Sequence, residues 1–275
     1  MAFSTNTIRI AVFDLDGTLY EDTSHFRYYA ERLAEKLPAD KQPLFRHDYS
    51  DMLEGNHPVA IGRVYDAAYD KVLEIDPASY RVTKVWDWEG KETGEEDAYT
   101  TPVSFDFDSM IAVGDGWWLP AAAAKHHGAG STFDAYQKTK AYMQTEDFQF
   151  AEDPERRFSL QQLGRQMHLI LLTNSQADDV GQLLRTLNLE GVFDEVIPEA
   201  AKPARTEAHF STILKKYEAE PEEVVSIGDN YLNDIVPAEN LGMASVLIDP
   251  LGKTPVRSET KRIAALRELF PLFHK

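Results

Sequence analysis

The sequence predicts an α/β protein with a doubly wound parallel sheet as its core and a mainly helical insertion that contains a small β element. From residue 153 onward, short apolar strands alternate with helices, a pattern typical of parallel sheets covered by helices on both faces. One apolar strand, IAVF at residues 10–13, lies far upstream. It must join the same sheet, because one strand and one helix cannot bury their own faces. We therefore expect a core of residues 1–20 and 153–275 and an inserted domain of residues 21–152.

Within the insertion, aromatic and leucine residues at helical spacing predict a helix over residues 24–37. A second helix is predicted over residues 57–75, beginning beside a proline. Residues 80–113 are rich in aromatic, β-branched and acidic residues, which predicts short strands around an acidic turn, GKETGEED. A helical stretch is expected over residues 119–144.

Downstream of the insertion, the alternation predicts an open sheet of the Rossmann-like kind. The expected strands are residues 168–174, 193–198, 223–229 and 244–249. The expected helices are residues 154–167, 176–189, 204–219 and 233–243, followed by a final amphipathic helix over residues 256–270.

Composition excludes several classes of protein. The net charge is −18, from 28 basic and 46 acidic residues, and such an acidic surface repels a nucleic-acid backbone. The chain has no cysteine, so it has neither disulfides nor a thiolate zinc site. No apolar run approaches the ~18 residues that a membrane helix needs, and the first residues lack the layout of a secretion signal. We expect a cytoplasmic protein with no membrane or nucleic-acid partner.

Polar residues gather where the predicted strands end. Two carboxylates follow the first strand in IRIAVFDLDGTLY, residues 8–20, and open α/β sheets bind ligands at the carboxyl ends of their strands. Oxygen ligands in a cluster suit a hard cation such as Mg²⁺, whereas a lysine, a hydroxyl and an amide suit a phosphoryl or carboxyl group. The candidate residues are Asp14, Asp16, Thr173, Asn174, Lys202, Asp229 and Asp234.

Four motifs carry these residues in a fixed order: DLDGTLY, LLTNS, AKP and GDNYLND. In their order, strand context and spacing they resemble the haloacid dehalogenase (HAD) superfamily of hydrolases. The resemblance covers residues 8–23 and 165–249. It implies that the insertion is a cap domain, which closes over the site, excludes water and supplies substrate contacts.

The resemblance also implies a role for each candidate. Asp14 would be the nucleophile that forms an aspartyl phosphate, and Asp16 would be the general acid and then the general base. Mg²⁺ would be held by the Asp14 side chain, the Asp16 main-chain carbonyl and Asp229. The transferring oxygens would be held by Thr173, Asn174 and Lys202. Asp234 would orient the waters of the metal or the lysine.

Asp16 separates the branches of the family. Members that dehalogenate 2-haloacids typically lack an acid at this position, because a halide leaves without a proton. We therefore expect a Mg²⁺-dependent phosphatase acting on a small phosphorylated metabolite, as a monomer or homodimer. The alternatives are a phosphoryl mutase resembling β-phosphoglucomutase, a non-catalytic binding module and a 2-haloacid dehalogenase.

Simpler interpretations compete at several positions. Thr173 and Asn174 could cap the following helix, and Asp234 could do the same further on. His126 and His127 form a pair that could bind a metal. Since no supporting acid or histidine is in register with them in the sequence, the end of a solvated helix is favoured.

Overall fold

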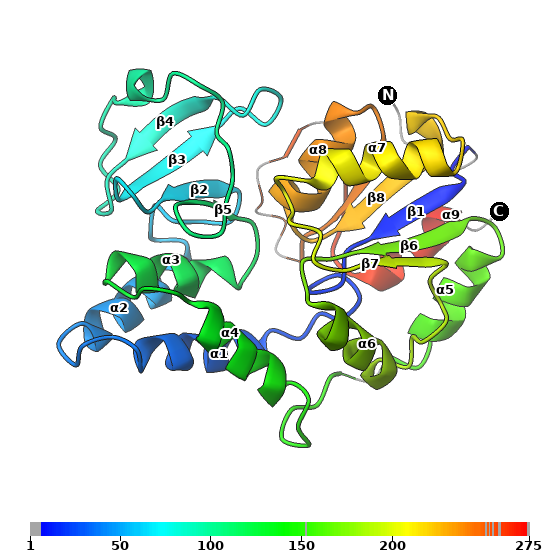
Figure 1. Cartoon of the computed structure of the whole chain (residues 1–275), viewed down its shortest axis with the longest axis horizontal. Helices are drawn as coiled ribbons and strands as arrows, with labels where there is room; N and C mark the ends of the chain where they lie inside the picture. Colours follow the sequence, from blue (N-terminus) through cyan, green and yellow to red (C-terminus); the bar gives the residue numbers. More distant parts are fainter. Residues whose placement is uncertain are drawn as a thin grey trace. The chain divides into compact units, whose positions relative to one another are not determined.

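The computed structural model describes residues 7–151, 153–250 and 260–273, with residues 252, 254, 256 and 257. The chain divides into two compact units (Figure 1). The core unit consists of Met1–Asp22 and Gln149–Lys275, and the inserted unit is Thr23–Phe148. The insertion predicted over residues 21–152 therefore differs from the inserted unit by only a few residues at each end.

The core unit contains the predicted parallel sheet, with six strands in the order β10-β9-β8-β1-β6-β7. Every neighbouring pair is parallel. The strands are β1 (Ile10–Phe13), β6 (His168–Leu172), β7 (Glu195–Ile197), β8 (Val224–Gly228), β9 (Ala244–Ile248) and β10 (Lys261–Ile263). All residues of β1 and β8 are buried, which explains why β1 is a continuous apolar run and why β8 is apolar except for Ser226, whose hydroxyl donates to the Asp234 carbonyl.

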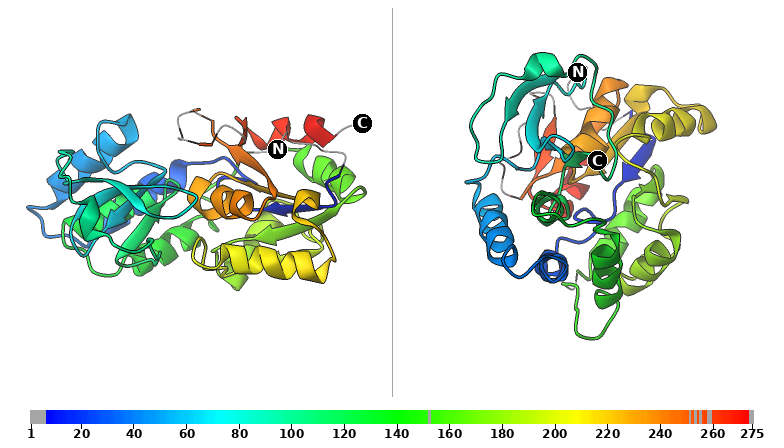
Figure 2. Two further views of the ribbon diagram at one scale, coloured as in Figure 1. Left: turned by 90° about the horizontal axis from the view of Figure 1, so that it is seen from above. Right: turned by 60° about the vertical axis from the view of Figure 1, so that its left-hand side comes forward.

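Helices cover both faces of this sheet. Figure 2 shows α7 on one face and α5 on the other. The helices are α5 (Arg156–Gly164), α6 (Ala177–Thr186), α7 (Thr206–Lys216), α8 (Val236–Asn240) and α9 (Phe270–Phe273), with a π-helical turn at Tyr231–Ile235 before α8. The doubly wound α/β core is thus confirmed.

The register of β1 fixes where the site lies. β1 pairs with β6 on one side and β8 on the other, and Phe13 is level with Leu171 and Ile227. The residues that follow these three strands therefore emerge at one edge of the sheet. The chain order reverses on either side of β1, and such a switch point is where open sheets form a ligand crevice.

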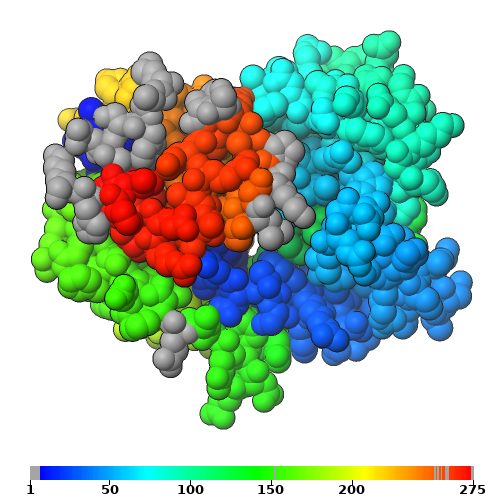
Figure 3. Space-filling view, turned by 180° about the vertical axis from the view of Figure 1, so that it is seen from behind, coloured from blue at the N-terminus to red at the C-terminus, as the bar shows by residue number. Residues whose placement is uncertain are grey.

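The final helix predicted over residues 256–270 is wrong. Lys261–Ile263 instead forms the edge strand β10, paired with β9, and the Asp249 amide donates to the Ile263 carbonyl at 2.8 Å. A 3₁₀ turn at Leu266–Glu268 and the short α9 follow. Backbone pairing with β9 outweighs the amphipathic pattern. Ser258 and Glu259, also in the predicted helix, lie outside the described residues. Figure 3 shows this C-terminal segment on the surface of the core unit, in red, beside the green of α5.

The inserted unit combines a small antiparallel sheet with helices. The sheet has the order β4-β3-β2-β5, with β2 (Arg63–Asp66), β3 (Lys71–Ile75), β4 (Val82–Trp86) and β5 (Met110–Val113). The helices are α1 (Ser24–Ala34), α2 (Gln42–Glu54), α3 (Trp118–His126) and α4 (Phe133–Tyr142). Strands were predicted within residues 80–113, and both β4 and β5 lie there. α2 was not predicted.

The helix predicted over residues 57–75 is also wrong, because this segment forms the hairpin β2–β3. Asp66 accepts backbone hydrogen bonds from Ala68 at 3.1 Å and Tyr69 at 3.3 Å. Asp70 has a φ of 55°, a left-handed conformation that interrupts a helix. Side-chain bonding of this kind favours a turn over a helix, so the two apolar halves of the segment pair with each other.

In the described part of the chain, no helix is both long enough and apolar enough to cross a bilayer.

Candidate active site

Three sequence-predicted acids follow strands that are neighbours in the sheet. Asp14 follows β1 directly and Asp229 follows β8, while Asp234 lies in the π-helical turn five residues later. Lys202 arrives from the loop between β7 and α7. The structure therefore brings together residues that are more than 200 positions apart in sequence.

Lys202 lies between two of these carboxylates. Its ammonium nitrogen is 2.7 Å from Asp14 Oδ1 and 2.6 Å from Asp234 Oδ1. The lysine is only 2% exposed and Asp234 only 3%. Charges this deeply buried require partners of opposite charge. Lys202 balances part of the negative charge of Asp14 and Asp234, and the two carboxylates stabilise the charged lysine.

Burial and charge shift the pKa values of this trio. Burial raises the pKa of Asp14 above its ordinary value, against the opposing effect of Lys202. Burial likewise raises the pKa of Asp234 to about 7, again opposed by Lys202. For Lys202, burial favours the neutral amine, but the charges of Asp14 and Asp234 outweigh it and raise its pKa. The lysine therefore stays charged, and both acids hold a proton more tightly than an exposed acid does.

The acids also fit a metal ion. Asp14, Asp229 and Asp234 each offer one oxygen, and these oxygens lie within 4.8 Å of one another. Three carboxylates against one lysine leave excess negative charge, and hard divalent cations take oxygen ligands. The donor set therefore suits Mg²⁺.

Two glycines allow the acids to approach the backbone. A Cβ on Gly17, whose φ is +78°, would lie 2.1 Å from Asp229 Oδ2. A Cβ on Gly228 would lie 2.2 Å from Asp234 Oδ2. Both distances are shorter than a van der Waals contact, so a side chain at either position would displace the carboxylate, and the positive φ of Gly17 favours glycine there in addition.

Asp16 is held by two hydroxyl groups. The Ser175 hydroxyl donates to Asp16 Oδ2 at 2.7 Å, and the Tyr20 hydroxyl donates to Oδ1. Sequence reasoning gave a role to neither Ser175 nor Tyr20. The sequence did offer a signal for them, because Ser175 is the last residue of the motif LLTNS and Tyr20 the last residue of the motif DLDGTLY.

Asn174 binds the backbone of the lysine loop. Its side-chain amide donates to the Lys202 carbonyl at 3.1 Å, and its side-chain oxygen accepts from the Lys202 amide at 2.7 Å. This pair of bonds joins the loop after β6 to the loop after β7. The contact positions Lys202, whereas the sequence suggested that Asn174 itself holds substrate oxygens.

The capping alternatives are not what the structure shows. Helix α6 has Gln176 as its N-cap residue, and the Thr173 hydroxyl accepts a hydrogen bond from the Ser175 amide at 3.1 Å. Asp234 Oδ2 accepts from the Asn230 amide at 3.2 Å, and α8 begins after Ile235. Neither Thr173 nor Asp234 caps the helix that follows it.

Comparison with known proteins identifies the family. The model of the haloacid dehalogenase-like hydrolase family matches residues 8–242. This chain belongs to that family. The HAD assignment made from the four motifs is therefore confirmed. A search of curated proteins finds no match.

Solved structures of HAD proteins share the fold. YfnB of Bacillus subtilis, assigned as an HAD hydrolase and bound to magnesium, superposes with a TM-score of 0.54 at 16% identity, covering 98% of this chain and 99% of that one. A dehalogenase superposes with a TM-score of 0.51 at 16% identity, covering 98% and 99%. The L-2-haloacid dehalogenase RSc1362 gives 0.50 at 15% identity, again covering 98% and 99%. At such identities the likeness establishes the fold alone.

Proposed function

We propose that this HAD hydrolase is a Mg²⁺-dependent phosphatase that cleaves a small phosphorylated metabolite. The observation that carries the proposal is Asp16, an acid two residues after Asp14 that is held by Ser175 and Tyr20. When the P–O bond of a phosphate monoester breaks, the alcohol part departs as an alkoxide that must be protonated, and a positioned carboxylic acid supplies that proton.

In the first step, an Asp14 oxygen attacks phosphorus, forming a P–O bond to the enzyme while the bond to the leaving oxygen breaks. Asp16 gives its proton to that oxygen, and the alcohol departs. In the second step, Asp16 takes a proton from a water molecule whose oxygen attacks phosphorus. The bond to Asp14 then breaks, and inorganic phosphate leaves.

The other site residues are proposed to bind or position the charged phosphoryl group. Lys202 and the Thr173 hydroxyl are proposed to bind the transferring oxygens, and Asn174 fixes the lysine loop. Mg²⁺, held by Asp14, Asp229 and the main-chain carbonyl of Asp16, would reduce the repulsion between the attacking carboxylate and the phosphate. Burial raises the pKa of Asp14 and so disfavours the ionised nucleophile, whereas the positive charge of Lys202 opposes this shift and favours the ionised form.

A 2-haloacid dehalogenase is the rival suggested by the solved neighbours. Carbon–halogen cleavage needs an attacking aspartate but no proton donor for the departing halide. In that reaction Asp16, which Ser175 and Tyr20 hold in place, would have no role as a proton donor. A mutase remains the nearest rival among phosphoryl-transfer enzymes, since it uses the same acids and differs in its product.

The test is a product assay on the purified protein with Mg²⁺. We expect inorganic phosphate to be released from members of a panel of sugar phosphates, nucleotides and phosphorylated acids. Asp14→Asn should abolish release while its circular dichroism stays unchanged. Asp178→Asn, an exposed acid on α6, is the matched control and should retain activity.

Three results would overturn the proposal. Chloride release from 2-chloropropionate without phosphate release would identify a dehalogenase. Isomerisation of a sugar phosphate without net phosphate release would identify a mutase. A folded protein that binds phosphorylated ligands and turns over none of the panel would identify a binding module.

A further inference from the structure

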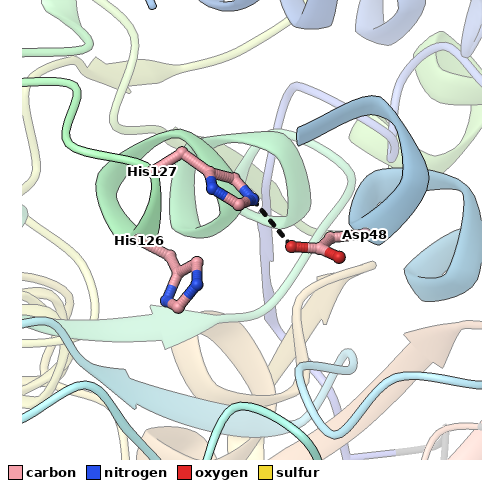
Figure 4. Close-up of side chains that lie close together, drawn as sticks. All are labelled: Asp48, His126 and His127. Atoms are coloured by element: carbon pink, nitrogen blue, oxygen red, sulfur yellow. Dashed lines mark hydrogen bonds and ion pairs between the residues drawn. The ribbon is translucent and has the colours of Figure 1, made fainter. Parts of the chain in front are cut away.

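Three side chains in the inserted unit form a second cluster of potential metal ligands (Figure 4). His126 is the last residue of α3, His127 follows it, and Asp48 lies in the middle of α2. Each offers one ligand atom, and these atoms lie within 4.8 Å of one another. Figure 4 shows the His127 ring pointing at the Asp48 carboxylate, with the His126 ring beside it.

The histidine pair is therefore not the solvated helix end that the sequence favoured. The His127 side chain is only 6% exposed, and its Nε2 lies 2.7 Å from Asp48 Oδ2. His126 Nδ1 lies 2.8 Å from Asp70 Oδ1. The supporting acids come from α2 and from the β2–β3 turn, 79 and 56 residues away in sequence, where no local pattern could reveal them.

We propose that Asp48, His126 and His127 bind one divalent transition-metal ion. Two imidazoles and one carboxylate are a common ligand set for Zn²⁺ sites that keep a further position open. The nitrogen donors distinguish this cluster from the all-oxygen cluster of the core unit, because imidazole prefers zinc, copper, nickel or iron over Mg²⁺.

The residues around the cluster orient the ligands. Asp70 occupies Nδ1 of His126, which leaves Nε2 for a metal, and a carboxylate behind a metal-binding histidine is a frequent arrangement. The Tyr65 hydroxyl in turn donates to Asp70 Oδ1 at 2.8 Å. Trp88 stacks on the His126 ring at 3.8 Å, and its indole N–H donates to Asp48 Oδ2 at 3.0 Å.

The spacing is close to that of a metal site. Ligand atoms of a tetrahedral zinc ion lie about 3.3 Å apart, given bonds of about 2.0–2.1 Å, whereas His127 Nε2 and Asp48 Oδ2 are 2.7 Å apart and all three ligand atoms lie within 4.8 Å of one another. Side-chain rotations would adjust these distances to those around a bound ion.

The consequence is a metal link between helices. An ion held by Asp48 and the two histidines would join the middle of α2 to the C-terminal end of α3. Such a link stabilises the folded state, because the ligands are not gathered in the unfolded chain.

The test uses Co²⁺ as the probe and the full-length chain without a histidine tag, in the presence of excess Mg²⁺ to occupy the core cluster. We expect one Co²⁺ to bind with visible d–d absorption and to raise the melting temperature. His126→Gln and His127→Gln should each abolish the absorption, and Asp70→Asn should weaken binding about 10–100-fold. His47→Gln, which removes an exposed histidine from the same helix α2, is the matched control and should bind Co²⁺ as the wild type does.

The outcomes separate this site from the proposed active site. Asp229→Asn should keep the Co²⁺ absorption, because Asp229 lies in the core unit. The proposal is overturned if the wild type shows no d–d absorption, or if either histidine variant, shown to be folded by circular dichroism, binds Co²⁺ as tightly as the wild type.

Discussion

The two clusters of potential metal ligands differ in donor atoms and in charge. The core unit gathers only oxygens, from Asp14, Asp229 and Asp234, with Lys202 as the neighbouring cation. The inserted unit gathers one oxygen and two imidazole nitrogens. The core cluster therefore suits a hard cation and the inserted cluster a borderline one.

The electrostatic difference is as important as the chemical one. In the core, three carboxylates share one lysine, so negative charge remains to be balanced. In the inserted unit Asp48 and Asp70 each have one imidazole partner, since Asp48 contacts His127 and Asp70 contacts His126. The core site thus needs a further cation to balance its charge, whereas the carboxylates at the inserted cluster already have hydrogen-bond partners, and a metal ion would replace the contact between His127 and Asp48.

The largest expected effect concerns catalysis in the core alone. Asp16→Asn should lower kcat about 10²–10⁴-fold for alkyl phosphates, because the leaving alkoxide loses its proton donor. The loss should be much smaller for p-nitrophenyl phosphate, whose leaving group needs no proton. Steady-state kinetics on both substrates measure the contrast. An equal loss on the two would contradict a role in protonation, and Co²⁺ absorption by the inserted unit should stay unchanged.

The next effect tests the contact between two core loops. Asn174→Ala removes both hydrogen bonds to the Lys202 backbone, and a small displacement of a positioning group can cost up to about 10²-fold in rate. We expect a fall in kcat of about 10–100-fold with the melting temperature little changed. Asn174→Asp keeps the acceptor and should lose less. An unaltered kcat in the alanine variant would refute the positioning role.

The burial of Asp234 predicts that the stability of the core unit depends on pH. The pKa of Asp234 is about 7 in the folded chain against an ordinary value of 3.8. Between these values the folded state keeps a proton that the unfolded chain has lost, so this group's contribution to the free energy of unfolding falls as pH rises.

Asp234→Asn should remove that contribution. The stability of the variant relative to the wild type, in EDTA, should therefore rise between pH about 5 and about 8. Urea denaturation of both proteins at the two pH values measures this change in relative stability. Excess Mg²⁺ should reduce the difference, because a cation replaces the proton, and a relative stability independent of pH would contradict the shifted pKa.

The smallest expected effect concerns Asp106 in the inserted unit, whose carboxylate accepts hydrogen bonds from nearby backbone amides. Burial would raise the pKa of Asp106, but hydrogen bonds from Ser109, Met110 and Asp108 outweigh it and lower the pKa to about 2. Asp106→Ala should cost about 0.5–1.5 kcal/mol near neutral pH. The stability that Asp106 adds is present above its ordinary value of 3.8 and is lost as pH falls toward 2. Denaturation near neutral pH and near pH 2 checks whether the stability difference between the wild type and Asp106→Ala disappears at the lower pH.

Most of the core unit was predictable because its sequence signals are local. The exception is β10 (Lys261–Ile263), where pairing with β9 decides the structure. The five predicted strands are short apolar runs, the site residues lie in the loops after them, and parallel strands bring such loops to one edge. The sequence thus located Asp14, Lys202 and Asp234 near one another before any coordinates. It did not predict that Asn174 binds the Lys202 backbone, because that contact depends on the path of two loops.

The inserted unit was less predictable because long-range contacts decide it. Residues 57–75 have helical spacing as well as strand residues, and pairing within the hairpin β2–β3 decides between them. The environment of His126 and His127 depends on Asp70 and Asp48, whose positions follow from the packing of α2, α3 and the small sheet. No short motif records that packing.

The position of β1 has a consequence for synthesis on the ribosome. Among the described strands of the sheet this strand is synthesised first, yet it lies in the interior, and its neighbours begin only at His168 and Val224. The nascent chain must therefore carry this apolar segment without its partners until the inserted unit, which ends at Phe148, has been made. Translation that stalls before His168 leaves both edges of the segment open to chaperones or to aggregation, and a stall between His168 and Val224 leaves one edge open.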